Sequence, residues 1–397
     1  MGCGREVCKQ DSILKINKIT YAYYLQPELK INTDKHIPQL DGLRGIAILM
    51  VMCYHFFPNN IVCNFGWSGV DLFFVLSGFL ITGRLMPYLD DKKILLKFYR
   101  NRFLRIVPLY FGFLILFFTG WFLLSSKETL SSFTFYNDHW WQFFLFIQNW
   151  VFTNNLVEVK IHLQHLWSIA VEEQIYLFFP LLLVFIRNKI NVFYFLVFLI
   201  IVIIVGRGYY YNFLIPKEES LKIFYNTFFR LDSFLTGVLV YFIYHNPEKY
   251  NKAKTALYWL ALFSFAALII YIAVTHDAEK NNSFISGGGY SLIALMYGGM
   301  LLITLFKSSN IINILTSFRF LRYTGKISYS IYIFHWPLFL IGFAVFNKAF
   351  TYFNFYPGGI TIHLMNVFIC IPIIYLISHL SFKYFESYFL KRKISLV

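Results

Sequence analysis

Apolar runs long enough to cross a lipid bilayer recur along this 397-residue chain from one end to the other. A membrane helix needs about 20 predominantly apolar residues, and only helices or closed barrels satisfy the backbone hydrogen bonds inside a bilayer. Hydrophobic residues make up 58% of the sequence, which excludes an ordinary soluble globular protein. The sequence therefore predicts an all-α fold, a polytopic bundle of membrane-spanning helices.

Windows of high hydropathy predict ten membrane spans. They cover, roughly, residues 40–57, 69–89, 105–124, 166–186, 191–206, 223–244, 256–275, 290–306, 328–347 and 360–382. An eleventh apolar stretch, residues 139–152, is only 14 residues long. If it does not cross and the N-terminus is cytoplasmic, most Lys and Arg residues fall in cytoplasmic loops, as the positive-inside rule requires. We therefore expect a re-entrant or interfacial segment there, both termini in the cytoplasm, and a multi-pass protein of the cell inner (cytoplasmic) membrane.

The predicted domain organisation is one membrane domain, residues 38–390, between cytoplasmic segments at 1–37 and 391–397. The first segment is polar and shows no signal-peptide pattern. The net charge of +15 is interpreted as contact with anionic lipids, because the chain carries no nucleic-acid-binding motif. The five cysteines show neither metal-ligand spacing nor a disulfide framework, so Cys53 and Cys370 are interpreted as small core residues.

Ionisable residues inside the predicted spans indicate function, because a charge in the bilayer is costly. Arg44 and His55 lie eleven residues apart in the first span, so they share one helix face and are separated by about 16 Å along its axis. In the predicted orientation His55 lies near the outer end of its span, and Asp71 lies just inside the outer end of the second. Asp71 is predicted either to orient the His55 imidazole or to cap its own helix.

Two further pairs of charged residues lie in later spans. Glu172 and Glu173 are adjacent, about 100° apart on a helix, so they cannot both face one site. Glu172 shares a face with His165, which opens the same span. Arg230 and Asp232 are expected to form a structural polar pair within the bundle.

Three arginines, Arg100, Arg102 and Arg105, lie at the cytoplasmic mouth of the third span. Guanidinium groups bind phosphate through paired hydrogen bonds, so this trio suits a phosphorylated cosubstrate, although loop topology alone also favours arginines there. A histidine near carboxylates suits general-base chemistry on a hydroxyl group. Acyl-coenzyme A, with phosphates at one end and a thioester at the other, has the shape to connect the two layers.

Five segments resemble, in order, the signatures of the acyltransferase-3 family, bacterial integral-membrane enzymes that O-acylate, usually O-acetylate, cell-surface carbohydrates. The segments are LDGLRGIAILMVMCYHF, GVDLFFVLSGFLIT, FYRNRFLRIVPLY, HLWSIAVEEQIYLFFPLLL and ISYSIYIFHWPL. The resemblance extends from about Leu40 to about Phe385. It implies that His55 is the essential histidine and that Arg44 acts alone, because Ala47 stands where some members carry a second arginine.

The resemblance also assigns the remaining polar positions. The basic motif of the family maps onto Arg100, Arg102 and Arg105, its Ser-x3-Glu-Glu-Gln segment onto Ser168, Glu172, Glu173 and Gln174, and its late histidine onto His335. A packing role for His335 is the alternative to a place along the donor tunnel. The predicted catalytic residues are therefore His55, Asp71 and Glu173, and the predicted donor-binding residues are Arg44, Arg100, Arg102, Arg105 and His335.

The predicted function is transfer of an acyl group, with acetyl expected, from cytosolic acyl-CoA (acetyl-CoA) to a hydroxyl of a cell-surface carbohydrate or lipid-linked glycan. Direct transfer and an acyl-histidine intermediate are alternative routes, and no metal is expected. Some members carry an extracellular esterase-like domain; this sequence ends at Val397, so delivery is expected directly or through a separate extracytoplasmic partner. The competing classes are a transporter or flippase for a glycolipid or polysaccharide unit and a non-catalytic assembly subunit.

Overall fold

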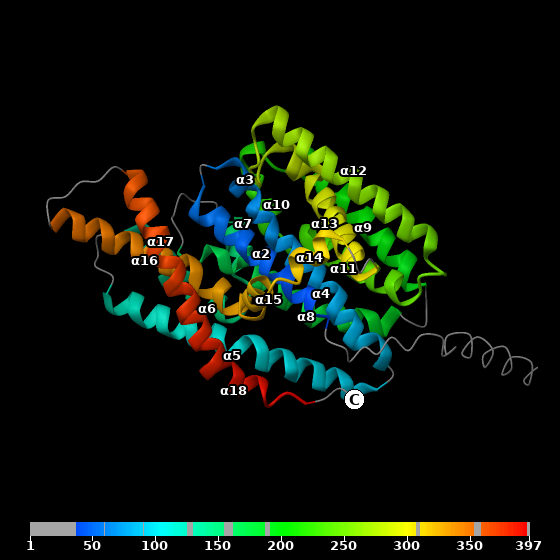
Figure 1. The fold of residues 1–397 in the computed structure, drawn as a ribbon, viewed down its shortest axis with the longest axis horizontal. Coiled ribbons are helices and arrows are strands. Elements are labelled where there is room, and N and C mark those ends of the chain that lie inside the picture. The colour runs from blue at the N-terminus through cyan, green and yellow to red at the C-terminus, as the bar shows by residue number, and fades with distance from the viewer. Residues whose placement is uncertain are drawn as a thin grey trace, which may run out of the picture. The chain divides into compact units, whose positions relative to one another are not determined.

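The computed structural model describes residues 37–58, 60–89, 91–124, 130–154, 162–186, 191–306, 310–352 and 359–394. These residues form helices joined by short connections, and no β-strand occurs among them (Figure 1). The all-α fold class predicted from the sequence is confirmed. The predicted cytoplasmic segment 1–37 lies outside the described residues except for Ile37.

Each of the ten predicted spans corresponds to one helix. These helices are α2 (Pro38–Phe56), α4 (Gly69–Leu85), α5 (Lys92–Leu124), α8 (Trp167–Ile186), α9 (Val192–Tyr209), α11 (Thr227–His245), α12 (Asn251–Thr275), α13 (Tyr290–Phe306), α16 (Ser328–Tyr352) and α17 (Gly359–Leu380). The largest difference in bounds is at α5, which begins 13 residues before the predicted span, since its first turns carry the basic residues that the hydropathy windows excluded.

Shorter helical segments connect the long helices. The α-helical ones are α3 (Ile61–Asn64), α6 (Leu130–Phe144), α7 (Gln148–Asn154), α10 (Leu221–Tyr225), α14 (Ile311–Thr316), α15 (Arg319–Lys326) and α18 (Ser387–Leu390). The 3-10 and π segments are η1 (Phe65–Ser68), η2 (Met86–Tyr88), η3 (Gln164–Leu166), η4 (Tyr210–Leu214), η5 (Lys217–Glu219), η6 (Ile285–Gly289) and η7 (Ser381–Glu386).

Nine helices in the described ranges are long and apolar enough to cross a membrane. Helix α2 is not one of them, because polar residues such as Asp41, Arg44 and His55 lower its hydropathy. It packs against α4, α15 and α16, with buried residues along its whole length. Figure 1 shows α2 between the α16–α17 pair on one side and the α12–α13 pair on the other. The charged face of α2 is therefore enclosed by protein.

Residues 139–152, predicted to be re-entrant or interfacial, form the end of α6 and most of α7. The chain breaks between these helices at Phe146, whose φ of 55° lies in the left-handed region. Helix α6 has 15 residues and α7 has seven, fewer than the roughly 20 that a span requires. The fully buried side chain of Gln148 donates to the Leu166 carbonyl, and that of Asn149 to the Tyr225 carbonyl. Helix α7 is thus anchored inside the bundle by polar side chains.

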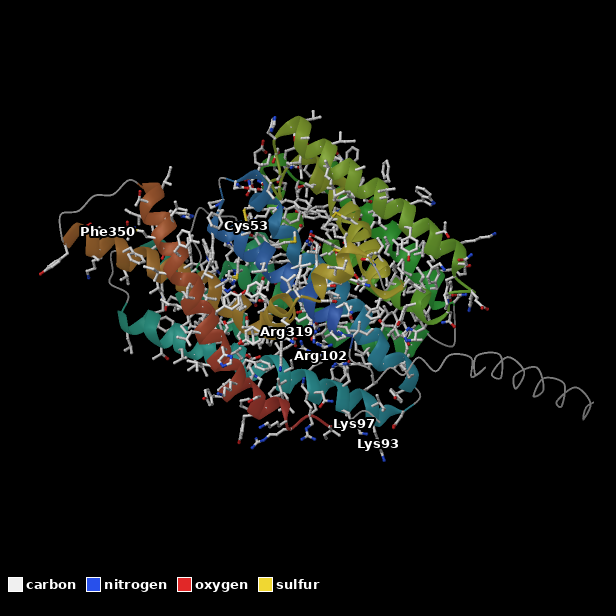
Figure 2. The ribbon with its side chains drawn as sticks, viewed as in Figure 1. Cys53, Lys93, Lys97, Arg102, Arg319 and Phe350 are labelled. Atoms are coloured by element: carbon white, nitrogen blue, oxygen red, sulfur yellow. A yellow bond between two sulfur atoms is a disulfide. The ribbon has the colours of Figure 1, made fainter. Side chains whose placement is uncertain are left out.

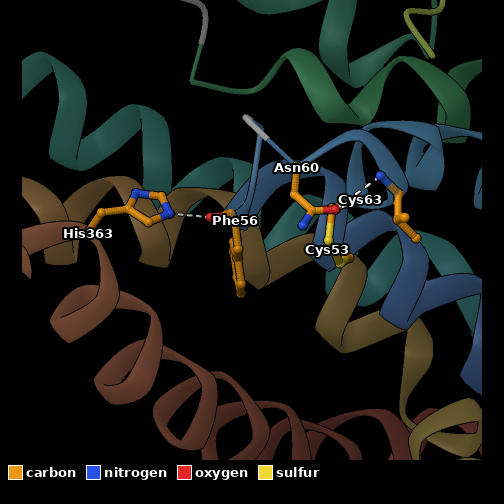
Figure 3. The surroundings of a disulfide bond; sticks show 6 residues. Cys53, Phe56, Asn60, Cys63 and His363 are labelled. Carbon is orange, nitrogen blue, oxygen red and sulfur yellow. Dashed lines mark hydrogen bonds between the residues drawn. A yellow bond between two sulfur atoms is a disulfide. The ribbon is translucent and has the colours of Figure 1, made fainter. Parts of the chain in front are cut away.

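Cys53 and Cys63 form a disulfide, so the interpretation of Cys53 as an isolated core residue was wrong (Figure 3). Helix α2 ends soon after Cys53, and the chain turns back into α3, where the Asn60 side chain accepts from the amides of residues 62 and 63. The sequence alone did not show that turn. The imidazole of His363 on α17 hydrogen-bonds the carbonyl of Phe56, as Figure 3 also shows. Cys370 is free and buried, as predicted.

The disulfide and the basic residues of α5 lie at different ends of the bundle. Figure 2 shows Lys93 and Lys97 at one edge and Cys53 toward the opposite edge, with Arg102 between them and nearer to the lysines. We refer below to the lysine end and the disulfide end of the bundle in this sense.

Helices α4 and α11 approach so closely that glycines are required at their contact. A Cβ atom on Gly78 would lie 2.0 Å from the carbonyl oxygen of Phe234, and one on Gly237 would lie 1.9 Å from that of Val75. Membrane helices commonly use small residues in this way, because lipid offers no hydrophobic driving force and close packing must hold the helices together. The contact fixes the register of α4 against α11.

Replacing Gly237 by Ala should destabilise the protein. In a helix interior this change ordinarily stabilises by about 1 kcal/mol, but here the methyl group overlaps a carbonyl and the overpacking should cost about 1–3 kcal/mol. Gly206 of α9 is a matched control, because nothing lies within 4 Å of a Cβ atom added there. We expect Gly237→Ala to lower the thermal unfolding temperature in detergent and Gly206→Ala not to lower it. Equal unfolding temperatures for the two variants would contradict the close contact.

Candidate active site

One cavity brings together arginines from two helices that are distant in sequence. Arg44 of α2 lines it with Arg102 and Arg105 of α5. Residues three apart share a helix face, so Arg102 and Arg105 point the same way, whereas Arg100 is about 200° from Arg102. Arg100 is exposed and is not among the lining residues of this arginine cavity. Two of the three predicted α5 arginines therefore converge with Arg44.

The carboxylate that faces the arginine cavity is Glu172, whereas Glu173 was favoured as the site residue. The side chain of Glu172 accepts hydrogen bonds from Ser77 and Tyr176, and the Arg102 guanidinium lies 4.6 Å from the Tyr176 ring centroid. Glu173 lines neither this cavity nor the one described next, and its Oε1 is buried without a hydrogen-bond partner. Adjacent helical residues point about 100° apart, so only one can face a given cavity.

A second cavity is lined by His55 and is called the histidine cavity below. It is lined mainly by aromatic and polar side chains, among them Tyr54, Trp67, Gln164, His165, Trp167, Tyr225, Lys280 and Trp336. The His55 ring packs against Trp336, with centroids 4.6 Å apart, and against Tyr54 at 5.0 Å. Arg44 and His55 therefore line different cavities, although they belong to the same helix.

The two cavities meet at Tyr332, which lines both of them together with Val70. The Tyr332 hydroxyl donates to the carbonyl of His165 at 2.6 Å and lies 2.6 Å from the Ser168 hydroxyl. Tyr332 and Val70 are the residues that the two described linings have in common. The two cavities are therefore neighbours that share these two wall residues.

Asp71, predicted as a catalytic partner of His55, is instead held by Arg230. Both side chains are fully buried, their closest N–O distance is 2.6 Å, and Ser233 donates to the same carboxylate oxygen at 2.7 Å. Asp232 pairs with the buried Arg207 of α9 at 2.9 Å. The expected Arg230–Asp232 pair was therefore wrong, because residues two apart on a helix point to opposite sides.

His335, which the sequence predicted as a donor-binding residue, is fully buried and lines neither cavity. Its ring lies behind His55, with centroids 5.1 Å apart, and 5.2 Å from the ring of His165. The described residues contain no cluster of three His, Cys, Asp or Glu side chains that could hold a metal ion.

Comparison with known proteins places the chain in a family. Residues 37–386 match a family described as "Acyltransferase domain". The chain belongs to the acyltransferase-3 family. "Putative O-acetyltransferase SACOL0978" of Staphylococcus aureus (strain COL) is 30% identical over 380 residues, 92% of this chain and 59% of that protein. "O-acetyltransferase OatA" of Staphylococcus aureus (strain NCTC 8325 / PS 47) is 30% identical over 321 residues, 78% of this chain and 51% of that protein. The chain spans little more than half the length of these relatives, and no solved structure matches it.

In this acyltransferase-family chain, sequence reasoning missed two residues of the histidine cavity. The sequence pattern indicates for His165 only a place at the start of a span, on the face of Glu172, and it does not single out Lys280. The Lys280 ammonium donates to the Tyr54 hydroxyl at 3.0 Å and lies 4.8 Å from the Phe224 ring centroid. Nothing in the sequence signals that Lys280 folds back to contact Tyr54 of α2, 226 residues earlier.

The C-terminal tail packs against α5 near the cavity arginines. The Asn101 side chain and the Ile394 backbone exchange two hydrogen bonds, of 2.7 and 3.0 Å, and hold the tail against α5. Lys393, the residue before Ile394, is half-buried. Its pKa is lowered to about 7 by burial and by the positive charges around it, those of Arg105, Arg84, Arg102 and Arg44. Glu386 of η7 accepts a hydrogen bond from Ser330 and interacts with Arg105 and, more weakly, with Lys393. Lys393 thus joins a cluster of cations drawn from three helices and the tail.

Proposed function

We propose that this protein is a membrane O-acyltransferase that moves an acyl group, acetyl in the first instance, from acyl-CoA to a hydroxyl of a cell-surface carbohydrate or lipid-linked glycan. The observation that carries the proposal is the pair of cavities that meet at Tyr332, one lined by arginines and the other containing His55. Membership of an acyltransferase family and the O-acetyltransferase names of the relatives support it.

The arginine cavity suits the phosphate groups of a nucleotide-bearing donor. Its described lining holds three guanidinium groups and one carboxylate, so an anionic ligand would relieve their mutual repulsion. Guanidinium forks bind phosphate oxygens through paired, charge-assisted hydrogen bonds. With the phosphates held by Arg44, Arg102 and Arg105, the thin pantetheine arm would pass Tyr332 and carry the thioester to His55.

The histidine cavity suits the transfer step and the acceptor. A neutral His55 would take the proton of the acceptor hydroxyl as its oxygen attacks the thioester carbon. The carbon–sulfur bond then breaks, and the thiolate leaves and takes up the proton from His55. The cationic Lys280 in the same lining would favour the negative charge on the carbonyl oxygen. Aromatic side chains such as Trp67 and Trp336 offer apolar surfaces on which a sugar ring can pack.

We further propose that the lysine end of the bundle is cytoplasmic and that the protein lies in the inner membrane with both termini inside. The disulfide supports this orientation, because such bonds persist in oxidising compartments outside the cytoplasm. The basic residues at the start of α5 support it through the positive-inside rule. The donor would then enter from the cytosol, and the acceptor from the opposite side, directly or through a separate extracytoplasmic partner.

The alternative of a transporter loses its main argument. A transporter would need the buried charges to line a pathway. Asp71 is instead paired with Arg230, and Asp232 with Arg207. These four residues line neither cavity. The charged residues that do line the cavities fit a donor site and a reaction site.

The test of the proposed function is the mass spectrum of surface glycans from matched strains that carry the wild type, His55→Ala, or no copy of the gene. We expect an acetyl mass increment that requires the wild type and disappears with His55→Ala, because the base is lost. Immunoblots should show equal amounts of both proteins in the membrane. Equal acetylation by His55→Ala at equal abundance would overturn the proposed mechanism.

Arg102→Ala should raise the KM for acetyl-CoA by at least tenfold while kcat changes little, because loss of a hydrogen bond to a charged group costs about 1.5–3 kcal/mol. Arg100→Ala is the matched control, since Arg100 has the same charge and is not part of the cavity lining. Release of free coenzyme A at varied donor concentration measures both constants. If the two variants have the same KM, the arginine cavity is not the phosphate site.

The affinity for the donor should also depend on the charge of Lys393. Its pKa of about 7 in the free protein means that the ammonium is charged at pH 6 and mostly neutral at pH 8. Bound phosphate favours the charged form, so the KM for acetyl-CoA should rise by about tenfold between pH 6 and pH 8. The dependence should disappear in Lys393→Ala and persist in the exposed control Lys391→Ala. Parallel KM profiles for wild type and Lys393→Ala would exclude Lys393 from the donor site.

A further inference from the structure

We propose that His335 is a positioning residue for His55. Its Nε2 atom has no hydrogen-bond partner in the structure, and in the proposed arrangement it accepts one from a ring N–H of His55, which leaves the other His55 nitrogen free to act as the base in the histidine cavity. The inference rests on the proposed function, in which His55 is the base. It assigns His335 a role that differs from donor binding.

The protonation of His335 follows from its neighbours. Its Nδ1 lies 2.8 Å from the carbonyl oxygen of Tyr332 and 3.1 Å from that of Ile331, one turn earlier in α16. Carbonyl oxygens only accept hydrogen bonds, so Nδ1 must carry the proton. In a neutral imidazole Nε2 is then an acceptor, and this atom is buried without a partner. An unpaired acceptor inside a bundle is costly, which indicates that a donor belongs beside it.

His165 cannot be that donor, and the reason lies in the proline of α16. Pro337 has no N–H, so the carbonyl of Ile333, four residues earlier, lacks its helical hydrogen bond. The Nε2 of His165 lies 3.2 Å from this carbonyl oxygen and must donate to it. The remaining nitrogen of His165, Nδ1, is therefore an acceptor as well, also buried without a partner.

His55 is the remaining donor among the rings that contact His335 in the described residues. The others are Phe56, which has no polar atom, His165, and Tyr332, whose hydroxyl donates to the His165 carbonyl. The centroids of His55 and His335 are 5.1 Å apart, which allows two ring nitrogens to reach the roughly 2.7–3.2 Å of a hydrogen bond.

The burial of His335 also indicates that it affects the reaction only through its contact with His55. The side chain has no exposed surface and lines neither cavity, so it cannot touch donor or acceptor. A carboxylate often orients a catalytic histidine, but Asp71 is committed to Arg230 in this protein. A neutral histidine with a fixed tautomer performs the same task without placing a negative charge beside the base.

The test compares two substitutions that each keep one half of the imidazole. His335→Asn places an amide near the Nδ1 position and keeps the bond to α16, whereas His335→Gln places an amide oxygen near the Nε2 position. We expect His335→Asn to lower kcat at least thirtyfold, with the KM for acetyl-CoA within twofold of wild type and an unchanged unfolding temperature. His335→Gln should recover at least a tenth of the wild-type kcat.

Other outcomes would overturn the inference. A raised donor KM at unchanged kcat would place His335 in the donor site, and higher activity of the Asn variant than of the Gln variant would make its role structural. If both variants fail to fold, ring 15N NMR of histidine-labelled wild type, with His55→Ala used to assign the His55 signals, decides the question: one neutral tautomer of His55 supports the inference and a mixture contradicts it. Full activity of His55→Ala would reject the proposed function itself, whereas full activity of His335→Asn alone would reject only this inference.

Discussion

A charge enclosed by membrane helices has no water to solvate it, so each buried ionic group depends on a partner within the protein. Asp71 and Arg230 meet this requirement for each other, and the Arg230 guanidinium also lies 4.1 Å from the Tyr290 ring centroid. Asp232 and Arg207 form the second pair, with the Ser291 hydroxyl in contact with both. The two pairs lie on opposite faces of α11, and each joins it to a different helix. Together they fix α4, α9 and α13 around α11.

Close backbone contacts make these polar bonds possible. The glycines between α4 and α11 bring the two helices near enough for a short salt bridge to form. The same device recurs between α2 and α15, where a Cβ atom on Gly325 would lie 1.7 Å from the Asp41 carbonyl oxygen. Helix α2 carries both Arg44 and His55, so its packing determines how far apart the two cavities lie. The disulfide at Cys53 and the hydrogen bond from His363 to the Phe56 carbonyl fix its other end.

The cavities differ from the rest of the bundle in how their charges are balanced. Elsewhere a buried arginine has one carboxylate, whereas Arg44, Arg102 and Arg105 share the cavity carboxylate Glu172, with Asp41 at 3.7 Å from Arg44. Excess charge of one sign in an enclosed space is characteristic of a binding site for the opposite sign. The three histidines in or beside the second cavity, His55, His165 and His335, likewise depend on neighbouring groups of the protein. Their tautomers depend on backbone carbonyls of α16, and Pro337 frees one of these carbonyls.

The sequence by itself determined the helical membrane fold, nearly all of its long helices, and the family, because apolar length and ordered motifs are local properties. It also determined that Arg44 and His55 share a face, since helical periodicity fixes that relation. The tertiary structure decided which polar groups meet. Asp71 pairs with Arg230, Glu172 and not Glu173 faces the arginines, and Cys53 meets Cys63. Lys280 lines the histidine cavity from a distant loop, and Lys393 of the C-terminal tail lies near the cavity arginines. Such pairings depend on the rotation of each helix about its axis and on the path of each loop. The local sequence pattern determines neither of these.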